Sequence, residues 1–325
     1  MSRSVMRILI VGASSFIGGH IRRVAAAAGH EVLTAGRGDG WSLRLDLVLD
    51  PVELVAAAIA GAAPDVVVNC AGATSGSAEV LAAANITAVH TLVSVLLEFV
   101  GDQAPRLVHL GSAAEYGAIT EDAAGVPVAE DAVPRPAGLY GVTKLGGTRL
   151  VQLARAAGLD AVVLRLFNVV GAGAPADSLP GATAAQLRQL GAGGPGGSLK
   201  LGPLDAVRDF VDARDCADAV LAAAAAPVLP HDIINIAGGT GVPARELVTR
   251  LLAVTGLDVT IREDAAGSPR TAALAWQQAD ITRAATDLDW RPRRDLAESM
   301  HDLWDGPWGT TEKEEVTGVN MRAPT

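Results

Sequence analysis

Lysine, tyrosine and cysteine are scarce in this chain of 325 residues. The two cysteines, Cys70 and Cys216, have no neighbours at metal-ligand spacing, so we predict reduced core residues, no disulfide and no metal site. Because alanine is abundant, apolar periodicity is noisy and the rare residues carry more weight. The complete set of lysines and tyrosines is Lys144, Lys200, Lys313, Tyr116 and Tyr140.

An excess of positive charge is also missing. The net charge is −10 and the isoelectric point is about 5.1. Non-specific affinity for nucleic acid comes mostly from lysine and arginine, so we predict no nucleic-acid partner. The first apolar run, Ile8 to Val11, is too short for a signal peptide, and no later run reaches membrane-spanning length without a charge. We therefore expect a cytoplasmic protein with no membrane partner.

Apolar residues make up 50% of the chain, which is enough for a large core that needs no disulfide or metal to fold. Short apolar strands alternate with helices through residues 1–168. This alternation predicts an α/β fold with a doubly wound parallel sheet covered on both faces. The predicted strands are Met6–Val11, Glu31–Ala35, Asp65–Cys70, Arg106–Leu110 and Ala161–Phe167, and the helices are Phe16–Ala28, Pro51–Ala60, Ala82–Val100 and Tyr140–Ala157.

The composition changes after Gly171. Two Gly/Pro-rich stretches, Gly171 to Pro180 and Gly191 to Gly197, predict loops around a site. We predict a smaller, interleaved α/β substrate domain over residues 169–305, with the chain returning to the first domain around 205–236. Residues 306–325 are polar and predict a disordered tail. The elements expected here are helices at 182–190, 207–226 and 243–255 and strands at 233–237 and 259–262.

A glycine turn, Gly12-Ala-Ser-Ser-Phe-Ile-Gly18, joins the first strand to the first helix. In that position its N–H groups and the helix N-terminus face a dinucleotide pyrophosphate. A turn that only closes a strand onto a helix is the alternative. The predicted contacts are Gly12, Ser15, Phe16, Ile17 and Gly18.

The end of the second strand bears on the choice of cofactor. An NAD-selective enzyme places a carboxylate there for the adenosine ribose, and this chain has Gly36 followed by Arg37. A guanidinium with no competing anion suits a 2′-phosphate. We therefore predict NADP(H), with NAD as the alternative.

Tyr140 and Lys144 open one predicted helix. Their i, i+4 spacing places the phenol and the ammonium on one face. A free tyrosine, with a pKa of about 10, is a poor acid at neutral pH, and a neighbouring ammonium lowers that pKa. We predict Tyr140 as proton donor and Lys144 as the group that tunes it.

Ser112 ends a strand within Leu110-Gly-Ser-Ala-Ala-Glu-Tyr-Gly117, at the carboxyl edge where open α/β sheets bind ligands. Together these motifs, with Leu164 to Gly171 and Leu201 to Asp215, resemble the extended short-chain dehydrogenase/reductases of the NAD-dependent epimerase/dehydratase type. Within that family the resemblance is closest to GDP-4-keto-6-deoxymannose reductases, and it extends to about Asp305.

The resemblance implies a role for each matching residue. Ser112, Tyr140 and Lys144 are the implied catalytic residues, with Lys144 also bonding the nicotinamide ribose. Further implied cofactor contacts are Asp46, Leu47, Ala71, Gly72 and Asn85. The implied substrate contacts are Ala73, Ser112, Glu115, Asn168, Arg208 and Arg270, with Asn168 and Arg208 holding phosphates.

Three departures qualify the resemblance. Ser15 replaces the middle glycine of the family turn, so its Cβ is expected to crowd the pyrophosphate. Ala113 and Ala114 stand where sugar-nucleotide dehydratases carry Asp and Glu, which argues against a dehydratase. Ser268-Pro-Arg-Thr271 replaces an Arg-Pro-Ser-Glu run, so Arg270 is the remaining candidate for a nucleotide contact.

The resemblance, with Ser112, Tyr140 and Lys144 all present, implies an oxidoreductase that uses NADPH to reduce the C4 keto group of a nucleotide-linked 4-keto-6-deoxyhexose. GDP is the favoured nucleotide, and dTDP and UDP remain open. Alternatives are a sugar-nucleotide 4-epimerase with retained NAD and a non-catalytic NADP-sensing protein. The resemblance also implies a homodimer through helices 82–100 and 140–157, with packing of these helices inside one chain as the alternative.

Overall fold

The computed structural model describes residues 5–99, 104–117, 125–193, 196–263 and 275–306. The predicted contact from Arg270 and the predicted tail after residue 306 therefore lie outside the described residues. Within them, the dominant feature is a seven-stranded sheet in the order β3-β2-β1-β4-β5-β6-β10. Its strands are β1 (Arg7–Val11), β2 (Glu31–Gly36), β3 (Leu43–Arg44), β4 (Val66–Asn69), β5 (Arg106–Ser112), β6 (Ala161–Leu166) and β10 (Ile233–Ile236).

Every pairing in this sheet is parallel, and helices cover both faces. Side chains alternate between the faces, so that in β1 Ile8 contributes to one buried cluster and Leu9 to the other. The predicted doubly wound sheet is therefore confirmed. One face carries α1 (Phe16–Ala27) and α7 (Ala213–Ala225), and the other carries α2 (Val52–Ala62), α4 (Ala88–Glu98) and α5 (Leu139–Ala156).

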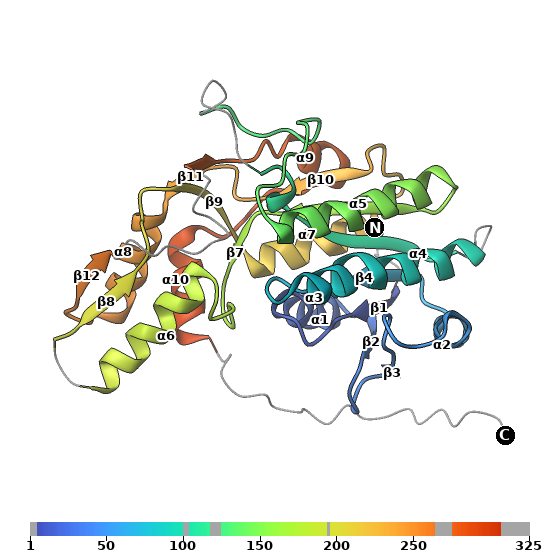
Figure 1. Ribbon diagram of the computed structural model, residues 1–325, viewed down its shortest axis with the longest axis horizontal. Coiled ribbons are helices and arrows are strands. Elements are labelled where there is room, and N and C mark those ends of the chain that lie inside the picture. Colours follow the sequence, from blue (N-terminus) through green and yellow to red (C-terminus); the bar gives the residue numbers. More distant parts are fainter. Residues whose placement is uncertain (1–4, 100–103, 118–124, 194–195, 264–274, 307–325) are drawn as a thin grey trace.

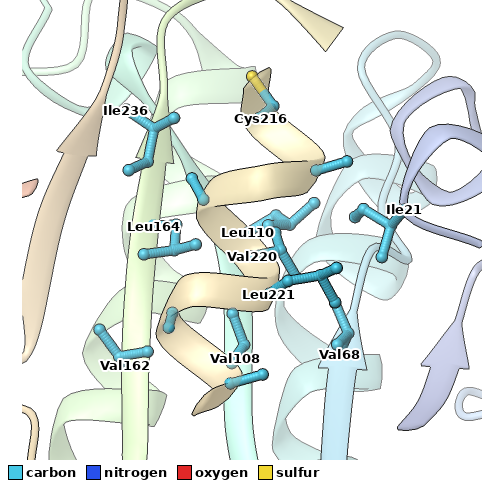
Figure 2. Close-up of a cluster of buried hydrophobic side chains, with 14 of the residues drawn as sticks. Ile21, Val68, Val108, Leu110, Val162, Leu164, Cys216, Val220, Leu221 and Ile236 are labelled. Atoms are coloured by element: carbon cyan, nitrogen blue, oxygen red, sulfur yellow. The ribbon is translucent and has the colours of Figure 1, made fainter. Parts of the chain in front are cut away.

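Helix α7 illustrates how the core is filled. Figure 2 shows Cys216 and Val220 on this helix lying over strand residues such as Val108 and Leu164. Small alanines on the same helix let it lie close to the sheet. Cys216 is fully buried as a free thiol, as expected from the sequence.

The predicted helix over 207–226 is wrong in its first part. Residues Val207–Asp212 form strand β9, and α7 begins only at Ala213. The Asp212 side chain caps the helix by accepting a hydrogen bond from the Arg214 N–H, which marks the boundary. The long alanine-rich run that follows concealed this short strand.

A second region is built from short strands and further helices and lies to the left of the large sheet in Figure 1. Strand β9 pairs with three partners in a small sheet, and β10 and α7 return to the large sheet. The sequence predicts that residues around 205–236 return to the first domain. The structure differs for β9, which belongs to the second region. The elements of this region are β7 (Asn168–Val170), α6 (Leu179–Ala192), β8 (Ser198–Leu201), β11 (Gly241–Pro243), α8 (Ala244–Thr255), β12 (Thr260–Glu263), β13 (Trp276–Gln277) and α10 (Leu296–Asp305), while α9 (Thr282–Leu288) packs beside α7.

One helix among the described residues is long and apolar enough to cross a membrane, Ala78–Glu98. It joins α3 (Ala78–Ala82) to α4 through a π-helical turn, Ala83–Thr87. The expectation that no uncharged apolar run reaches this length is therefore wrong. Because α4 buries Leu92, Leu96 and their neighbours against the sheet, its apolar residues have a place in the core, and the length alone is weak evidence.

Candidate active site

The glycine turn before α1 packs closely against the end of β4. Gly12 has a φ of +80°, and a Cβ there would lie 2.6 Å from the backbone nitrogen of Ala71. A Cβ on Gly18 would lie 2.4 Å from the carbonyl oxygen of Gly12. The first N–H groups of a helix, here those of Phe16 and Ile17, have no intrahelical acceptor. This tight turn with free donors fits the pyrophosphate of a dinucleotide.

Ser15 is the N-cap of α1. Its Oγ accepts a hydrogen bond from the Gly18 N–H at 3.1 Å, so the side chain turns back onto the helix. Because the Ser15 hydroxyl is directed toward Gly18, only the Cβ of this side chain can crowd a bound pyrophosphate.

The adenosine end of the predicted site lies beyond β2. Arg37 is exposed directly after this strand. Asp46 uses one carboxylate oxygen to accept hydrogen bonds from the N–H groups of Val48 and Leu49, and Leu47 is buried. Asp46 thus shapes the turn after β3.

Asn85 braces the wall of the cleft. It is 1% exposed and lies in the π-helical turn, a distortion often found at functional sites. Its amide donates to the carbonyl of Ala73 at 2.9 Å and to Thr143 Oγ1 at 3.0 Å, and its Oδ1 accepts from the Ala73 N–H. A Cβ on Gly72 would come within 2.8 Å of this oxygen. Asn85 therefore holds Gly72 and Ala73 against α5.

The three predicted catalytic residues come from two elements that touch. Ser112 ends β5, and its Oγ accepts a hydrogen bond from the Ala114 N–H at 3.2 Å. Tyr140, half-buried, and Lys144 lie in the first turns of α5. A Cβ on Gly141 would lie 2.4 Å from the carbonyl oxygen of Ala114, so only glycine permits this approach. The helix with Tyr140 is thus seated on the turn that follows Ser112.

Lys144 is buried and fixed to the same strand. Its Nζ donates a hydrogen bond to the carbonyl of Leu110 at 2.5 Å. Burial lowers the pKa of Lys144, and the negative charge of Glu115 partly offsets this effect. Burial also raises the pKa of the neighbouring Cys70 to about 12, so that residue is a neutral thiol at neutral pH.

Glu115 is completely buried, with both carboxylate oxygens bound within the protein. Oε1 accepts a hydrogen bond from the Ser112 N–H at 2.8 Å, and Oε2 pairs with Arg165 Nε at 2.9 Å. The Arg165 guanidinium also lies 4.5 Å from the centre of the Tyr116 ring. These contacts correct the implied substrate contact, because Glu115 positions Ser112 instead of facing the cleft.

The predicted substrate contacts Asn168 and Arg208 lie in the second region. Asn168 donates a hydrogen bond to the carbonyl of Asp209, and Arg208 on β9 is 5% exposed. Burial lowers the pKa of Arg208. In the register of β9 and β13, Gln277 lies opposite Arg208, and its amide donates to the carbonyl of Ala113 at 3.1 Å. Gln277 thus joins the second region to the serine turn, and its two-residue strand carried no sequence signal.

Asp209 anchors β9 from the opposite side. Its buried carboxylate accepts hydrogen bonds from the N–H groups of Gly238 at 2.7 Å, Gly239 at 3.1 Å and Ala279 at 3.0 Å. Burial raises the pKa of Asp209 to about 6, against the lowering effect of these donors. No group of three potential metal-ligating side chains occurs in the described ranges.

The comparison with protein families now places the chain. Residues 8–237 match the model of the NAD dependent epimerase/dehydratase family. The chain belongs to this family. The predicted family resemblance is therefore confirmed, and the matched span runs from β1 to the end of the large sheet.

Two curated members of the epimerase/dehydratase family cover nearly the whole chain. A dTDP-6-deoxy-L-talose 4-dehydrogenase (NAD(P)(+)) of Kitasatospora kifunensis is 38% identical over 92% of this chain and 94% of its own length. A GDP-6-deoxy-D-mannose reductase of Pseudomonas aeruginosa is 26% identical over 95% of this chain and 99% of its own length.

Solved structures of the family share the fold. RMD from Pseudomonas aeruginosa complexed with NADPH has a TM-score of 0.79 at 22% identity, over 92% of this chain and 98% of that one. MoeE5 in complex with UDP-glucose and NAD has a TM-score of 0.75 at 23% identity, over the same shares. Both nicotinamide cofactors thus occur among these neighbours, in keeping with the predicted NADP(H) and its NAD alternative.

Proposed function

We propose that this protein is an NADPH-dependent oxidoreductase that reduces the C4 keto group of a nucleotide-linked 4-keto-6-deoxyhexose. The observation that carries the proposal is the seating of α5 on the serine turn, which brings Tyr140 and the buried Lys144 to the strand end that bears Ser112. Two curated relatives are named for chemistry on 6-deoxyhexoses, one of them explicitly at carbon 4.

The nucleotide is the finer part of the proposal. Sequence motifs favoured GDP. The relative with 38% identity is named for a dTDP sugar and the one with 26% for a GDP sugar, so we now favour dTDP over GDP. Asn168 and Arg208 remain the proposed phosphate contacts, and both are held by the β7–β9 sheet.

The proposed mechanism assigns one task to each catalytic side chain. When bound, the nicotinamide cofactor supplies the hydride that adds to C4. The Ser112 hydroxyl donates a hydrogen bond to the carbonyl oxygen, where negative charge develops. Tyr140 transfers its phenolic proton to that oxygen, giving the alcohol. The Lys144 ammonium, fixed at Leu110, favours the resulting phenolate.

The same residues serve the reverse reaction. A phenolate at Tyr140 would then remove the proton of a C4 hydroxyl, and the hydride that leaves C4 would pass to the oxidised cofactor when it is bound. The direction is set by the supply of reduced or oxidised cofactor, which agrees with a relative named as a dehydrogenase and another named as a reductase.

A 4-epimerase is the second candidate. A UDP-glucose 4-epimerase of Azospirillum brasilense is 28% identical over 90% of this chain. An epimerase retains NAD through the cycle and consumes none, whereas a reductase oxidises one NADPH per product. A non-catalytic NADP-sensing protein would bind the cofactor without consuming it.

The test is to mix purified protein and NADPH with dTDP-4-keto-6-deoxyglucose and, in parallel, with GDP-4-keto-6-deoxymannose. We expect loss of NADPH absorbance, faster with the dTDP sugar. Faster loss with the GDP sugar would reverse the nucleotide assignment. No loss with either sugar would contradict the reductase, and NAD bound to the purified protein would then favour the epimerase.

We also propose that the protein is a homodimer through the helices beside the site. On α5, Leu139, Val142 and Leu153 share one face and are 46%, 48% and 68% exposed in the single chain. Val80 on α3, which contacts α5, is 50% exposed. An apolar stripe left uncovered by its own chain suits a second copy. Leu153→Asp should shift the mass measured by light scattering from dimer to monomer, and an unchanged dimer would contradict this interface.

A further inference from the structure

The segment between β2 and β3 is held in one conformation by its own hydrogen bonds. The Thr34 N–H donates to Ser42 Oγ at 3.1 Å, and the Ser42 N–H donates to Thr34 Oγ1 at 3.2 Å. The Leu45 N–H donates to the carbonyl of Gly36 at 2.9 Å. The chain thus folds back on the end of β2, which fixes the place of Trp41 between these contacts.

Trp41 lies directly against Gly36. A Cβ built on Gly36 would be 2.7 Å from Trp41 Nε1 and 2.9 Å from Cδ1, closer than real atoms approach. An NAD-selective carboxylate would have to start from this Cβ. The indole edge therefore fills the position of the acceptor group and presents an N–H, which is a donor only.

Two arginines lie next to Gly36, one along the chain and one across the sheet. Arg37 follows Gly36, and Arg44 on β3 lies opposite Gly36 in the parallel register. Both side chains are exposed, and within the described part of the chain neither has an ion-pair partner. Asp39 is also exposed, but it lies on the loop after Arg37 and not at the position of Gly36. The end of β2 thus offers three donor groups, the indole N–H and two guanidiniums, and has no carboxylate at the position of Gly36.

We propose that Trp41 and Arg44, together with Arg37, form the pocket for the 2′-phosphate of NADP(H). A 2′-phosphate presents acceptor oxygens and negative charge, which an indole N–H and two guanidiniums match. A ribose 2′-hydroxyl is bound best by an acceptor, and the indole offers none. This inference deepens the proposed function at its cofactor site and rests on its preference for NADPH.

The test uses ligands that contain only the adenosine end. Binding of 2′,5′-ADP and of 5′-AMP to the full chain is measured by titration calorimetry, for wild type, Trp41→Phe and Arg44→Gln. Phenylalanine keeps an aromatic ring and removes the N–H. We expect each variant to bind 2′,5′-ADP about tenfold more weakly, as for a lost hydrogen bond to a charged group, with 5′-AMP changed less than about twofold. Arg262→Gln, another exposed arginine on a strand, β12, is the control and should change neither.

Equal weakening of both ligands by Trp41→Phe would make the indole a stacking surface for adenine and overturn the proposal. Unchanged affinity for 2′,5′-ADP would overturn it as well. Circular dichroism of each variant verifies the fold. Because neither ligand carries a nicotinamide or a deoxyhexose, failure of the reductase assay leaves these affinities untouched, and the two proposals fail separately.

A second pair of variants tests the steric part. Gly36→Asp alone should weaken NADPH without strengthening NADH, because the new side chain meets the indole. Gly36→Asp combined with Trp41→Ala has room for the carboxylate and should bind NADH about tenfold more tightly than Gly36→Asp alone. An equal gain for NADH from Gly36→Asp alone would contradict the role given to Trp41.

Discussion

The large sheet and the second region differ in what positions their parts. In the sheet, short strands such as Val66–Asn69 are buried at every position, and apolar helix faces cover them. The second region also has an apolar cluster, around Leu187, Leu247 and Met300, but its strands near the site are fixed in addition by single buried polar side chains. Asp209 binds backbone N–H groups, and Gln277 binds the serine turn. A pattern of residue types encodes the sheet, whereas individual side chains decide how the second region meets the serine turn. The candidate active site lies where the two meet.

The largest effect is expected at the chemistry carried by the large sheet. Tyr140→Phe removes the proton donor and should lower turnover at least about 100-fold, with NADPH affinity kept. Steady-state rates and NADPH titration measure the two quantities. Leu54→Ala, at an exposed apolar position on α2, serves as the control. A Tyr140→Phe variant that retains a tenth of wild-type turnover would contradict the assignment of the acid.

Glu115→Gln tests a buried ion pair that supports the site from within the sheet. The variant leaves the guanidinium of Arg165, whose side chain is 1% exposed, without its anion. Breaking a buried pair should reduce the free energy of unfolding by about 3 kcal/mol, measured by urea denaturation. The matched control is Glu246→Gln, whose exposed pair with Arg250 is worth less than about 1 kcal/mol. Equal losses in both variants would contradict the account.

Glu115→Gln also has a kinetic readout that a purely structural role would not give. The Glu115 carboxylate raises the pKa of Lys144, which burial lowers. Its removal should therefore lower that pKa further, and the basic limb of the turnover profile should move to lower pH. An unshifted profile, measured in the folded variant, would restrict Glu115 to a structural role.

Asp209 provides the corresponding test in the second region. Burial raises its pKa from the ordinary 3.8 to about 6. A raised carboxyl pKa contributes stability that is present below pH 3.8 and lost as the pH rises through about 6. Asparagine does not titrate. The free energy of unfolding of Asp209→Asn, measured by urea denaturation, should therefore rise relative to that of wild type as the pH increases across this interval. Asp205→Asn, at an exposed site nearby, should show no such trend. A constant difference for Asp209→Asn would mean that its backbone donors keep the carboxylate ionised.

The smallest effect is expected at Ser15. Ser15→Gly removes a helix cap and should cost only a few tenths of a kcal/mol, roughly 0.3 kcal/mol. Because the hydroxyl turns onto Gly18, NADPH affinity should change less than about threefold. A tenfold rise in NADPH affinity would instead mean that the Ser15 side chain crowds the pyrophosphate, as the sequence predicts.

The fold of residues 1–168 could be predicted because each apolar strand ends at a turn and precedes a helix of ordinary length. Strand β9 could not, because six residues ahead of an alanine-rich helix have no period of their own. The motif places Glu115 beside the substrate, whereas the folded chain brings Arg165 to its second carboxylate oxygen. Gln277 and Trp41 act through contacts between distant or folded-back segments, which no spacing in the sequence records.

The central claim is that hydride moves from NADPH to C4 of a keto sugar at the Ser112, Tyr140 and Lys144 site. The direct measurement uses NADPH carrying deuterium on the transferable position of the nicotinamide, with dTDP-4-keto-6-deoxyglucose as substrate and mass spectrometry and NMR of the product. The account predicts one deuterium at C4 for each NADPH oxidised. A product without deuterium at C4, or a substrate returned unchanged with the NADPH intact, would contradict it.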